Sequence, residues 1–152
     1  MNMSKEILIL YGTETGNSEL LAMDAEKLAK DNQFDVTING MDEIGLEDIQ
    51  EHKNVIIVCS TWGDGEQPDN AVDLYEATVD SDDNSLEGIN FAVLALGDTA
   101  FDLFCEAGIQ WDETFEAKGG NRINNRIDCD TDYEDDAEQW IEETIAKFVE
   151  IE

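Results

Sequence analysis

The stretch E-I-L-I-L-Y-G-T-E-T-G-N-S at residues 6–18 decides the fold of this chain. Its first six residues form an apolar run of strand length, and a turn of glycines and hydroxyl residues follows directly. Residues 18–31 then change to the apolar spacing of a helix. The positions that carry this spacing are Leu21, Ala25, Leu28 and Ala29. A strand that enters a helix through a short polar loop predicts a β-α unit of a parallel sheet.

The same alternation of strand and helix continues to the end of the chain. Further strands are predicted at residues 34–38, 54–60, 90–97 and 121–128, the last one weaker and more polar. Helices are predicted at residues 46–52, from 71 to 79, at 101–117 and from 137 to 149, where the apolar periodicity is clearest. Five uninterrupted β-α units predict one parallel sheet with helices on both faces, in a single domain over residues 1–152.

The charge of the chain is strongly negative. It has 38 Asp and Glu residues against 8 Lys and Arg, a formal net charge of −30. Nucleic acid and anionic membranes are disfavoured as partners because they carry the same sign of charge. Basic protein surfaces are the expected partners, and a field of this size would steer them toward the chain. Part of the charge can simply be solvated surface, and adaptation to high salt is a further hypothesis.

Cysteine content and hydropathy bear on the compartment. The three cysteines, Cys59, Cys105 and Cys129, are too few and odd in number for a disulfide framework. No apolar run approaches the about 18 residues of a membrane span, and no export signal precedes the first strand. We therefore expect a cytoplasmic protein with reduced thiols, without a membrane or nucleic-acid partner, and monomeric.

The loop at residues 12–18 has the composition of a phosphate site. Its hydroxyl groups and asparagine amide are donors, its glycines leave the backbone N–H groups accessible, and a helix begins at its end. It contains no lysine or arginine, and its spacing fits neither a Walker loop nor the G-x-G-x-x-G of dinucleotide-binding proteins. A plain hydroxyl-rich helix cap is the alternative.

Two later loops each carry an aromatic residue just beyond a predicted strand, at the same edge of the predicted sheet. Trp62 lies in S-T-W-G-D-G-E-Q-P-D-N, residues 60–70, where an indole between polar residues suits the wall of a flat ligand. Phe101 lies in G-D-T-A-F-D-L-F-C, residues 97–105. The alternatives are a tryptophan packed on neighbouring surface and a phenylalanine that begins the core face of a helix. Ligands of such sheets bind at the carboxyl ends of the strands.

Together the three loops resemble those of flavodoxins of the short-chain type, over essentially the whole chain. The resemblance implies a flavodoxin-like, doubly wound α/β fold with a five-stranded parallel sheet in the order 2-1-3-4-5, and non-covalently bound FMN. The phosphate-holding residues it implies are Thr13, Glu14, Thr15, Gly16, Asn17 and Ser18. Further cofactor-binding residues are Ser60, Thr61, Trp62, Gly63, Asp64, Leu96, Gly97, Asp98, Phe101, Phe104 and Cys105.

The resemblance also implies individual roles. Trp62 would cover one flavin face and Phe101 the other, where the family usually has a tyrosine. Ser60 and Thr61 would lie near the ribityl chain or the phosphate, and Gly97 and Asp98 would present backbone to the pyrimidine edge. The carbonyl of Gly63 would turn toward flavin N5. None of these roles needs a catalytic acid, base or nucleophile.

The function implied is a low-potential one-electron carrier between a flavodoxin reductase and acceptor redox enzymes, not an enzyme. Carboxylates near the flavin would oppose addition of a second electron; they are Asp64, Glu66, Asp98 and Asp102. An FMN-dependent accessory protein or quinone reductase, and a flavin-free adaptor, remain as alternatives. The P-D-N at residues 68–70 is also similar to FMN domains of diflavin reductases. The only histidine, His52, is expected at the surface, at the end opposite the ligand loops.

Overall fold

A computed structural model describes residues 5–13, 16–62, 65–98 and 103–151. Their strands form a six-stranded parallel sheet in the order β2-β1-β3-β4-β5, with β6 paired to β4. The strands are β1 (Lys5–Gly12), β2 (Phe34–Gly40), β3 (Asn54–Ser60), β4 (Asn90–Leu96), β5 (Asn121–Arg122) and β6 (Ile127–Cys129). The strand order expected from the resemblance is confirmed.

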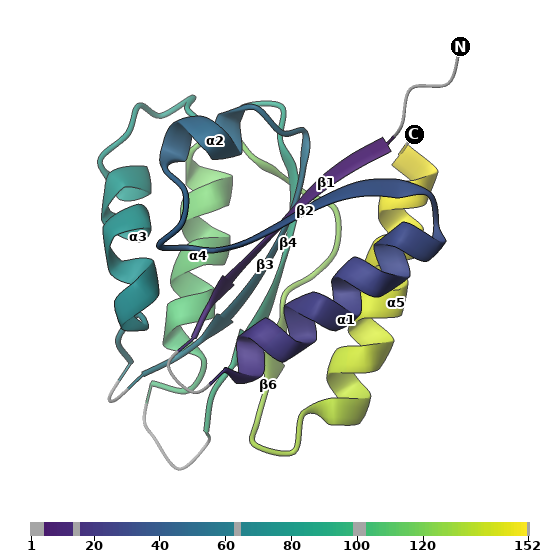
Figure 1. Ribbon diagram of the computed structural model, residues 1–152. Helices are drawn as coiled ribbons and strands as arrows, with labels where there is room; N and C mark the ends of the chain where they lie inside the picture. Colours follow the sequence, from purple (N-terminus) through teal and green to yellow (C-terminus); the bar gives the residue numbers. More distant parts are fainter. Residues whose placement is uncertain (1–4, 14–15, 63–64, 99–102, 152) are drawn as a thin grey trace.

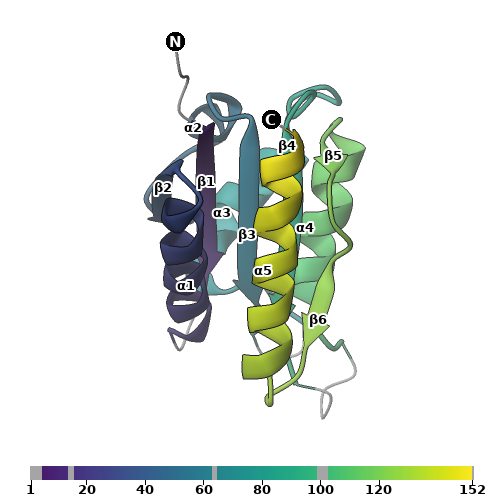
Figure 2. The ribbon, with the colours of Figure 1, turned by 90° about the vertical axis from the view of Figure 1, so that its right-hand side faces the viewer.

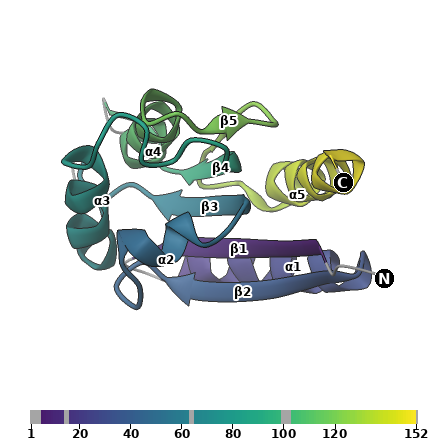
Figure 3. The same ribbon diagram turned by 90° about the horizontal axis from the view of Figure 1, so that it is seen from above.

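Helices cover both faces of the sheet (Figures 1 and 3). On one face lie α1 (Asn17–Asp31) and α5 (Glu134–Ile151). On the other lie α3 (Val72–Val79) and α4 (Glu106–Ala117), with the short α2 (Leu46–Gln50) at the end of the sheet where β3 begins. A 3-10 turn, η1 (Asp69–Ala71), leads into α3. The doubly wound architecture is thus the predicted one.

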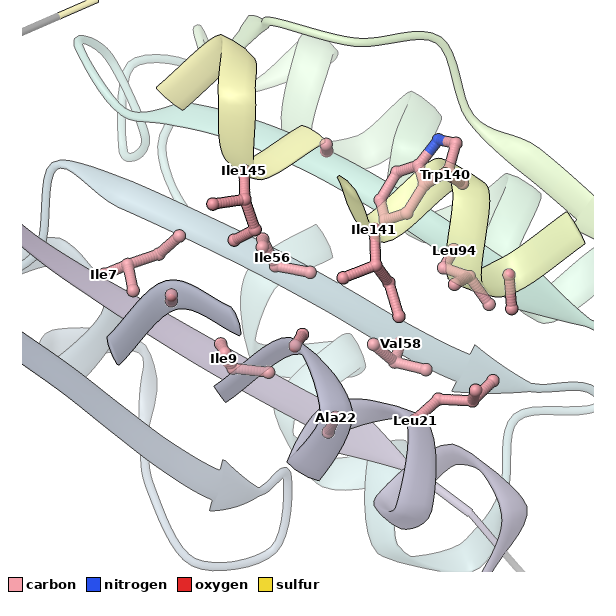
Figure 4. Close-up of a cluster of buried hydrophobic side chains, with 14 of the residues drawn as sticks. Ile7, Ile9, Leu21, Ala22, Ile56, Val58, Leu94, Trp140, Ile141 and Ile145 are labelled. Atoms are coloured by element: carbon pink, nitrogen blue, oxygen red, sulfur yellow. The ribbon is translucent and has the colours of Figure 1, made fainter. Parts of the chain in front are cut away.

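The apolar strands supply both faces of the sheet with core residues. Along β1, Ile7 and Ile9 face α1 and α5, whereas Leu8 and Leu10 face the α3 and α4 side. Neither set of positions along β1 needs to be polar, because helices cover both faces of the sheet. Figure 4 shows the first of these two layers, in which Ile141 of α5 and Leu21 of α1 lie over β3. Burying each such side chain contributes about 1.5–3 kcal/mol.

The predicted fifth strand is wrong in one respect, because it is divided into β5 and β6. Between them, Asn124 turns its buried amide inward and donates to Thr144 Oγ1 of α5 at 2.9 Å. Arg126 then extends to Asp112 of α4, with Nη1 to Oδ2 at 2.9 Å. These side-chain partners outside the sheet take residues 124–126 away from the ladder, whereas Ile123 still donates its N–H to the Phe91 carbonyl at 3.0 Å.

The helix predicted from residue 101 begins later. Cys105, the residue before α4, has a φ of 57°, which no α-helical residue adopts. The left-handed turn there forces the helix to begin at Glu106. Phe101, on which the earlier start was based, lies outside the described residues.

The sequence predicts His52 at the surface, but its side chain is only partly exposed. Its side chain is 17% exposed, and Nδ1 lies 2.8 Å from Glu6 Oε1 at the start of β1. Its predicted distance from the ligand loops is confirmed, since it directly precedes β3. Within the described residues, no helix combines the length and apolar character that crossing a membrane requires.

Candidate cofactor site

The strand register brings the carboxyl ends of β1, β3 and β4 to one edge of the sheet. Gly12 of β1 pairs with Cys59 of β3, and Ser60 pairs with Leu96 of β4. The three predicted ligand loops therefore leave neighbouring strands at the same level. Figure 2 shows this edge at the bottom, where β1 and β3 end and α1 and α5 begin.

The start of α1 is a helix N-terminus with space in front of it. Gly16 is its N-cap with a φ of 93°, and among the described residues a Cβ placed on it would meet no atom within 4 Å. Without a side chain at this position, the N–H groups of the first turn and the positive end of the helix dipole stay accessible to an anion. The nearest cations along the chain are Lys5 and Lys27. This cradle fits a phosphate bound by dipoles and hydroxyl groups.

The phosphate loop is held in shape by hydrogen bonds at its base. Thr13 Oγ1 accepts the Gly16 N–H at 2.8 Å, which closes the loop on itself. The N–H of Thr13 donates to Asn70 Oδ1 at 2.9 Å, which ties the loop to η1. Two predicted ligands, Glu14 and Thr15, lie outside the described residues, and Asn17 is exposed at the start of α1.

Ser18 and Ser60 meet beneath this loop. Their hydroxyl oxygens are 2.6 Å apart, and the Ser18 side chain is fully buried. The pair connects the first turn of α1 to the last residue of β3. Ser60 thus lies against the first turn of α1, and its place near the ribityl chain or the phosphate stays a prediction.

The loop after β3 places an exposed indole beside these groups. Trp62 and Glu66 form an isolated antiparallel β-bridge. The N–H of Trp62 donates to the Glu66 carbonyl at 2.8 Å, and the N–H of Glu66 donates to the Trp62 carbonyl at 2.7 Å. The bridge leaves Trp62 48% exposed, so one ring face can contact a planar ligand. Gly63 and Asp64, at the tip of this turn, lie outside the described residues. The N–H of Thr61 donates to the Leu96 carbonyl at 2.9 Å.

Thr61 has a structural partner that the sequence did not reveal. Its Oγ1 accepts the N–H of Ala107 in the first turn of α4 at 3.0 Å. The hydroxyl therefore satisfies one of the free donors at the start of that helix. Thr61 lies at the predicted edge, with its hydroxyl engaged by α4.

The loops after β3 and β4 contact each other. A Cβ built on Gly65, which has a φ of 116°, would lie 2.6 Å from Leu103 Cδ1. Leu103 itself is half exposed. The two loops thus meet at Gly65 and Leu103, and Phe101 lies outside the described residues.

The residues after β4 divide between surface and interior. Gly97 and Asp98 are partly exposed, and the N–H of Gly97 donates to the Cys129 carbonyl at 2.9 Å. Leu96 is buried and Phe104 partly so. Cys105 is fully buried, and its thiol donates to the Cys129 carbonyl at 3.5 Å. Burial, with the charges of Asp128 and Cys129, raises the pKa of Cys105 to about 12, so its thiol stays protonated at neutral pH.

Two residues missed by the sequence reasoning fasten the loop after β3. Gln67 Oε1 accepts the indole N–H of buried Trp111 at 2.9 Å, and its Nε2 donates to the Ala107 carbonyl at 3.0 Å. Asn70 reaches the phosphate loop as described above. The only signal for them in the sequence was their place in the polar run that follows Trp62.

Comparison with known proteins decides what kind of site this is. The family model for flavodoxin matches residues 9–140, which includes all three loops. The chain belongs to the flavodoxin family. Membership confirms the family resemblance seen in the loops, and with it FMN as the cofactor and electron transfer as the role.

The curated relatives are flavoprotein components that are much longer than this chain. The flavodoxin-family chain is 41% identical over 140 residues to the sulfite reductase [NADPH] flavoprotein alpha-component of Bacillus subtilis, strain 168. It is 33% identical over 145 residues to the protein of that name from Vibrio parahaemolyticus. These matches cover 92% and 95% of the chain but 23% of each relative, so the chain spans about a quarter of their length.

Solved flavodoxin structures match the chain along nearly their entire length. The flavodoxin of Streptococcus pneumonia TIGR4 superposes with a TM-score of 0.87 at 26% identity, covering 97% of this chain and 99% of that one. Oxidised Flavodoxin 2 from Bacillus cereus gives a TM-score of 0.79 at 31% identity, covering 97% and 99%. The chain thus resembles a whole flavodoxin in extent and a flavoprotein component in sequence.

Proposed function

We propose that this flavodoxin-family chain is a low-potential one-electron carrier that shuttles electrons on FMN between a reductase and acceptor redox enzymes. The observation that carries the proposal is the open N-terminus of α1 at Gly16, beside the exposed indole of Trp62. The helix end suits a phosphomonoester and the indole suits a flat ring. When bound, FMN would supply the capacity to take up and release electrons one at a time.

The chain's own residues would bind, orient and tune the cofactor. The backbone N–H groups at Asn17 and Ser18, with the hydroxyl of Ser60, would hold the phosphate. Trp62 would cover one ring face, and the backbone at Gly97 and Asp98 would face the pyrimidine edge. We keep Glu14, Thr15, Gly63, Asp64 and Phe101 as proposed ligands on the basis of the family resemblance alone.

The electrostatic setting would lower the reduction potential. The phosphate is held without a nearby lysine or arginine along the chain, and the net charge is −30. Each electron placed on the ring adds negative charge to this field, and each ~1.4 kcal/mol of opposition shifts the equilibrium tenfold. A carrier with a low reduction potential can reduce acceptors whose own reduction potentials are low.

Basic surfaces of a reductase and of acceptors are the proposed partners. An acidic carrier attracts such surfaces over distances of about a Debye length, roughly 10 Å at 0.1 M salt. The 41% identity to a sulfite reductase [NADPH] flavoprotein component supports an NADPH-linked donor and a reductase as acceptor. We propose that the chain carries electrons without turning over NADPH itself, in contrast to a quinone reductase.

The test is reconstitution followed by stepwise anaerobic reduction. Apoprotein titrated with FMN should take up about one equivalent and quench its fluorescence, and visible absorbance should show two separate one-electron steps. NADPH alone should leave the bound flavin oxidised, and addition of an NADPH-dependent reductase should reduce it. A protein that takes up no FMN would overturn the carrier proposal, and direct oxidation of NADPH with a quinone would favour the enzyme alternative.

A further inference from the structure

We propose that Asn70 is a positioning residue for the phosphate loop, acting from outside the loop to set its affinity for the phosphate of FMN. The inference rests on the proposed function, and it assigns a part in it to a residue outside the loop. The Asn70 side chain is the described link between η1 and the phosphate loop, through Thr13 N–H to Asn70 Oδ1 at 2.9 Å.

The contact lies at the point that controls the shape of the loop. Thr13 is the first residue after β1, and its hydroxyl accepts the N–H of Gly16, the N-cap of α1, at 2.8 Å. The direction of the Thr13 side chain depends on its own backbone, which Asn70 fixes by accepting its N–H. Asn70, Thr13 and Gly16 therefore form a relay from η1 to the helix end that receives the phosphate.

The asparagine is itself held rigidly. It lies in the middle of η1, between Pro68, whose ring fixes φ at −58°, and Ala71, which is fully buried. A Cβ placed on Gly12 would lie 3.2 Å from the Ala71 Cβ, so η1 packs directly against the end of β1. Asn70 also directs its amide to the Tyr11 carbonyl at 3.5 Å. The acceptor is thus held by contacts within the protein itself, which favours a preorganised site.

The position of η1 also links the phosphate loop to the wall that carries Trp62. Gln67, three residues before Asn70, is anchored to α4 through Trp111 and Ala107. The same short segment therefore fastens the ring-binding loop at one end and the phosphate loop at the other. Gln67 is expected to affect ring binding, whereas Asn70 is expected to affect phosphate binding.

The experiment compares FMN with riboflavin, which lacks only the phosphate. Wild-type apoprotein, Asn70→Ala and a surface control, Asp73→Ala, are titrated with each ligand. Asn70→Ala should weaken FMN binding by about tenfold or more, because binding must then also order a loop that Asn70 no longer holds through Thr13, and should change riboflavin affinity less than twofold. Asp73, exposed on the next turn, should change neither. Equal losses for both ligands would show general disruption and overturn the inference.

A second comparison tests the relay itself. Thr13→Val removes the hydroxyl that receives the Gly16 N–H, and the loss of FMN affinity in the Asn70→Ala, Thr13→Val double variant should be smaller than the two single losses combined. Additive losses would overturn the relay. Should Asn70→Ala not fold, Asn70→Ser serves for the same comparison. Failure of the wild type to bind FMN would instead contradict the proposed function, so the two failures are distinguishable.

Discussion

The hydroxyl oxygens of Ser18 and Ser60 lie 2.6 Å apart and join the buried first turn of α1 to the end of β3. Ser60→Ala should lower the free energy of unfolding by about 1–3 kcal/mol, because it leaves the Ser18 hydroxyl buried without this partner. In the double variant, in which Ser18 is also alanine, the loss of unfolding free energy should be smaller than the sum of the two single losses. Urea unfolding of the apoprotein measures all four species. Strictly additive losses would show that the two hydroxyl groups are independent.

A methyl group at Gly16 should impair phosphate binding beyond its effect on folding. Gly16 has a φ of 93° and open space where a Cβ would stand. Gly16→Ala should therefore cost about 1 kcal/mol of stability from backbone conformation alone. The same methyl group should weaken FMN binding, because it would occupy the cradle in front of the helix end.

Gly88 offers a matched control for this substitution. It has a φ of 86°, it also has nothing within 4 Å of the Cβ position, and it precedes β4 at the opposite end of the sheet. Gly88→Ala should lower stability by a similar amount and leave FMN affinity unchanged. Equal effects of the two substitutions on FMN affinity would rule out a local role for Gly16. Thermal melts and flavin fluorescence titration provide the two measurements.

Residue pattern predicted the fold because the information was local. The apolar run at residues 54–60 predicted a strand with the bounds that β3 has. Every residue of β3 except Ser60 is buried, so the requirement for apolar residues is written in the run itself. The break between β5 and β6 was not predictable, because Asn124 leaves the sheet to reach Thr144, twenty positions away. Side-chain partners that distant leave no mark in local periodicity.

The site was predicted in part for the same reason. Gly16 and Trp62 stand out by residue type within their loops, whereas the contribution of Asn70 depends on a bond to Thr13 across 57 positions. Cys105 was expected at the ligand because the loop at residues 97–105 resembles a flavin-binding loop of the family. Its thiol is buried and its backbone is left-handed, and a single left-handed residue is not encoded in apolar spacing.

The contact between Gly65 and Leu103 should make Gly65 intolerant of a side chain. Gly65→Ala would bring its Cβ to 2.6 Å from Leu103 Cδ1 and add the strain of a φ of 116°. We expect it to lower FMN affinity through displacement of the loop that carries Trp62. Adding Leu103→Ala removes the clash and should restore part of the affinity, while the backbone strain remains. No recovery in the double variant would show that the two loops do not depend on each other, as measured by flavin titration.

The buried thiols should reduce stability in alkali. Burial raises the pKa of Cys129 to about 11 and that of Cys105 to about 12, and raises the pKa of Cys59 as well, from an ordinary value of 9.0. Because the folded pKa is raised, the stabilisation is fully present below pH 9 and is lost as pH rises from 9 toward the folded pKa values. Each thiol can contribute a slope of up to about 1.4 kcal/mol per pH unit.

Urea unfolding between pH 8 and 10.5 measures this loss. Replacing all three cysteines with alanine should make the decline of unfolding free energy with pH shallower. Parallel curves for the two proteins would show that the thiols do not govern the alkaline limit. Below pH 9, the native thiols should also react slowly with a disulfide reagent, because the thiolate is the reactive form.

The excess of acid should make the folded state dependent on salt. With 38 acidic residues against 8 basic ones, repulsion between carboxylates opposes the compact state. Both arginines are already engaged by Asp112, Glu116 and Asp128 and so offer little further relief. Screening shortens the range of repulsion from about 10 Å at 0.1 M salt to about 3 Å at 1 M, so the melting temperature should rise steadily with KCl.

The groove between α1 and α5 provides a sharper version of this test. Asp24 of α1 and Glu138 and Glu142 of α5 line this groove, and Lys27 is the one cation among its described lining residues. The triple variant Asp24→Asn, Glu138→Gln, Glu142→Gln should melt at a higher temperature than wild type in dilute buffer and gain less from KCl. The two melting curves should converge at molar salt, where screening does the work of neutralisation. A melting temperature that does not change with KCl in either protein would contradict carboxylate repulsion as the limit on stability and leave salt adaptation without support.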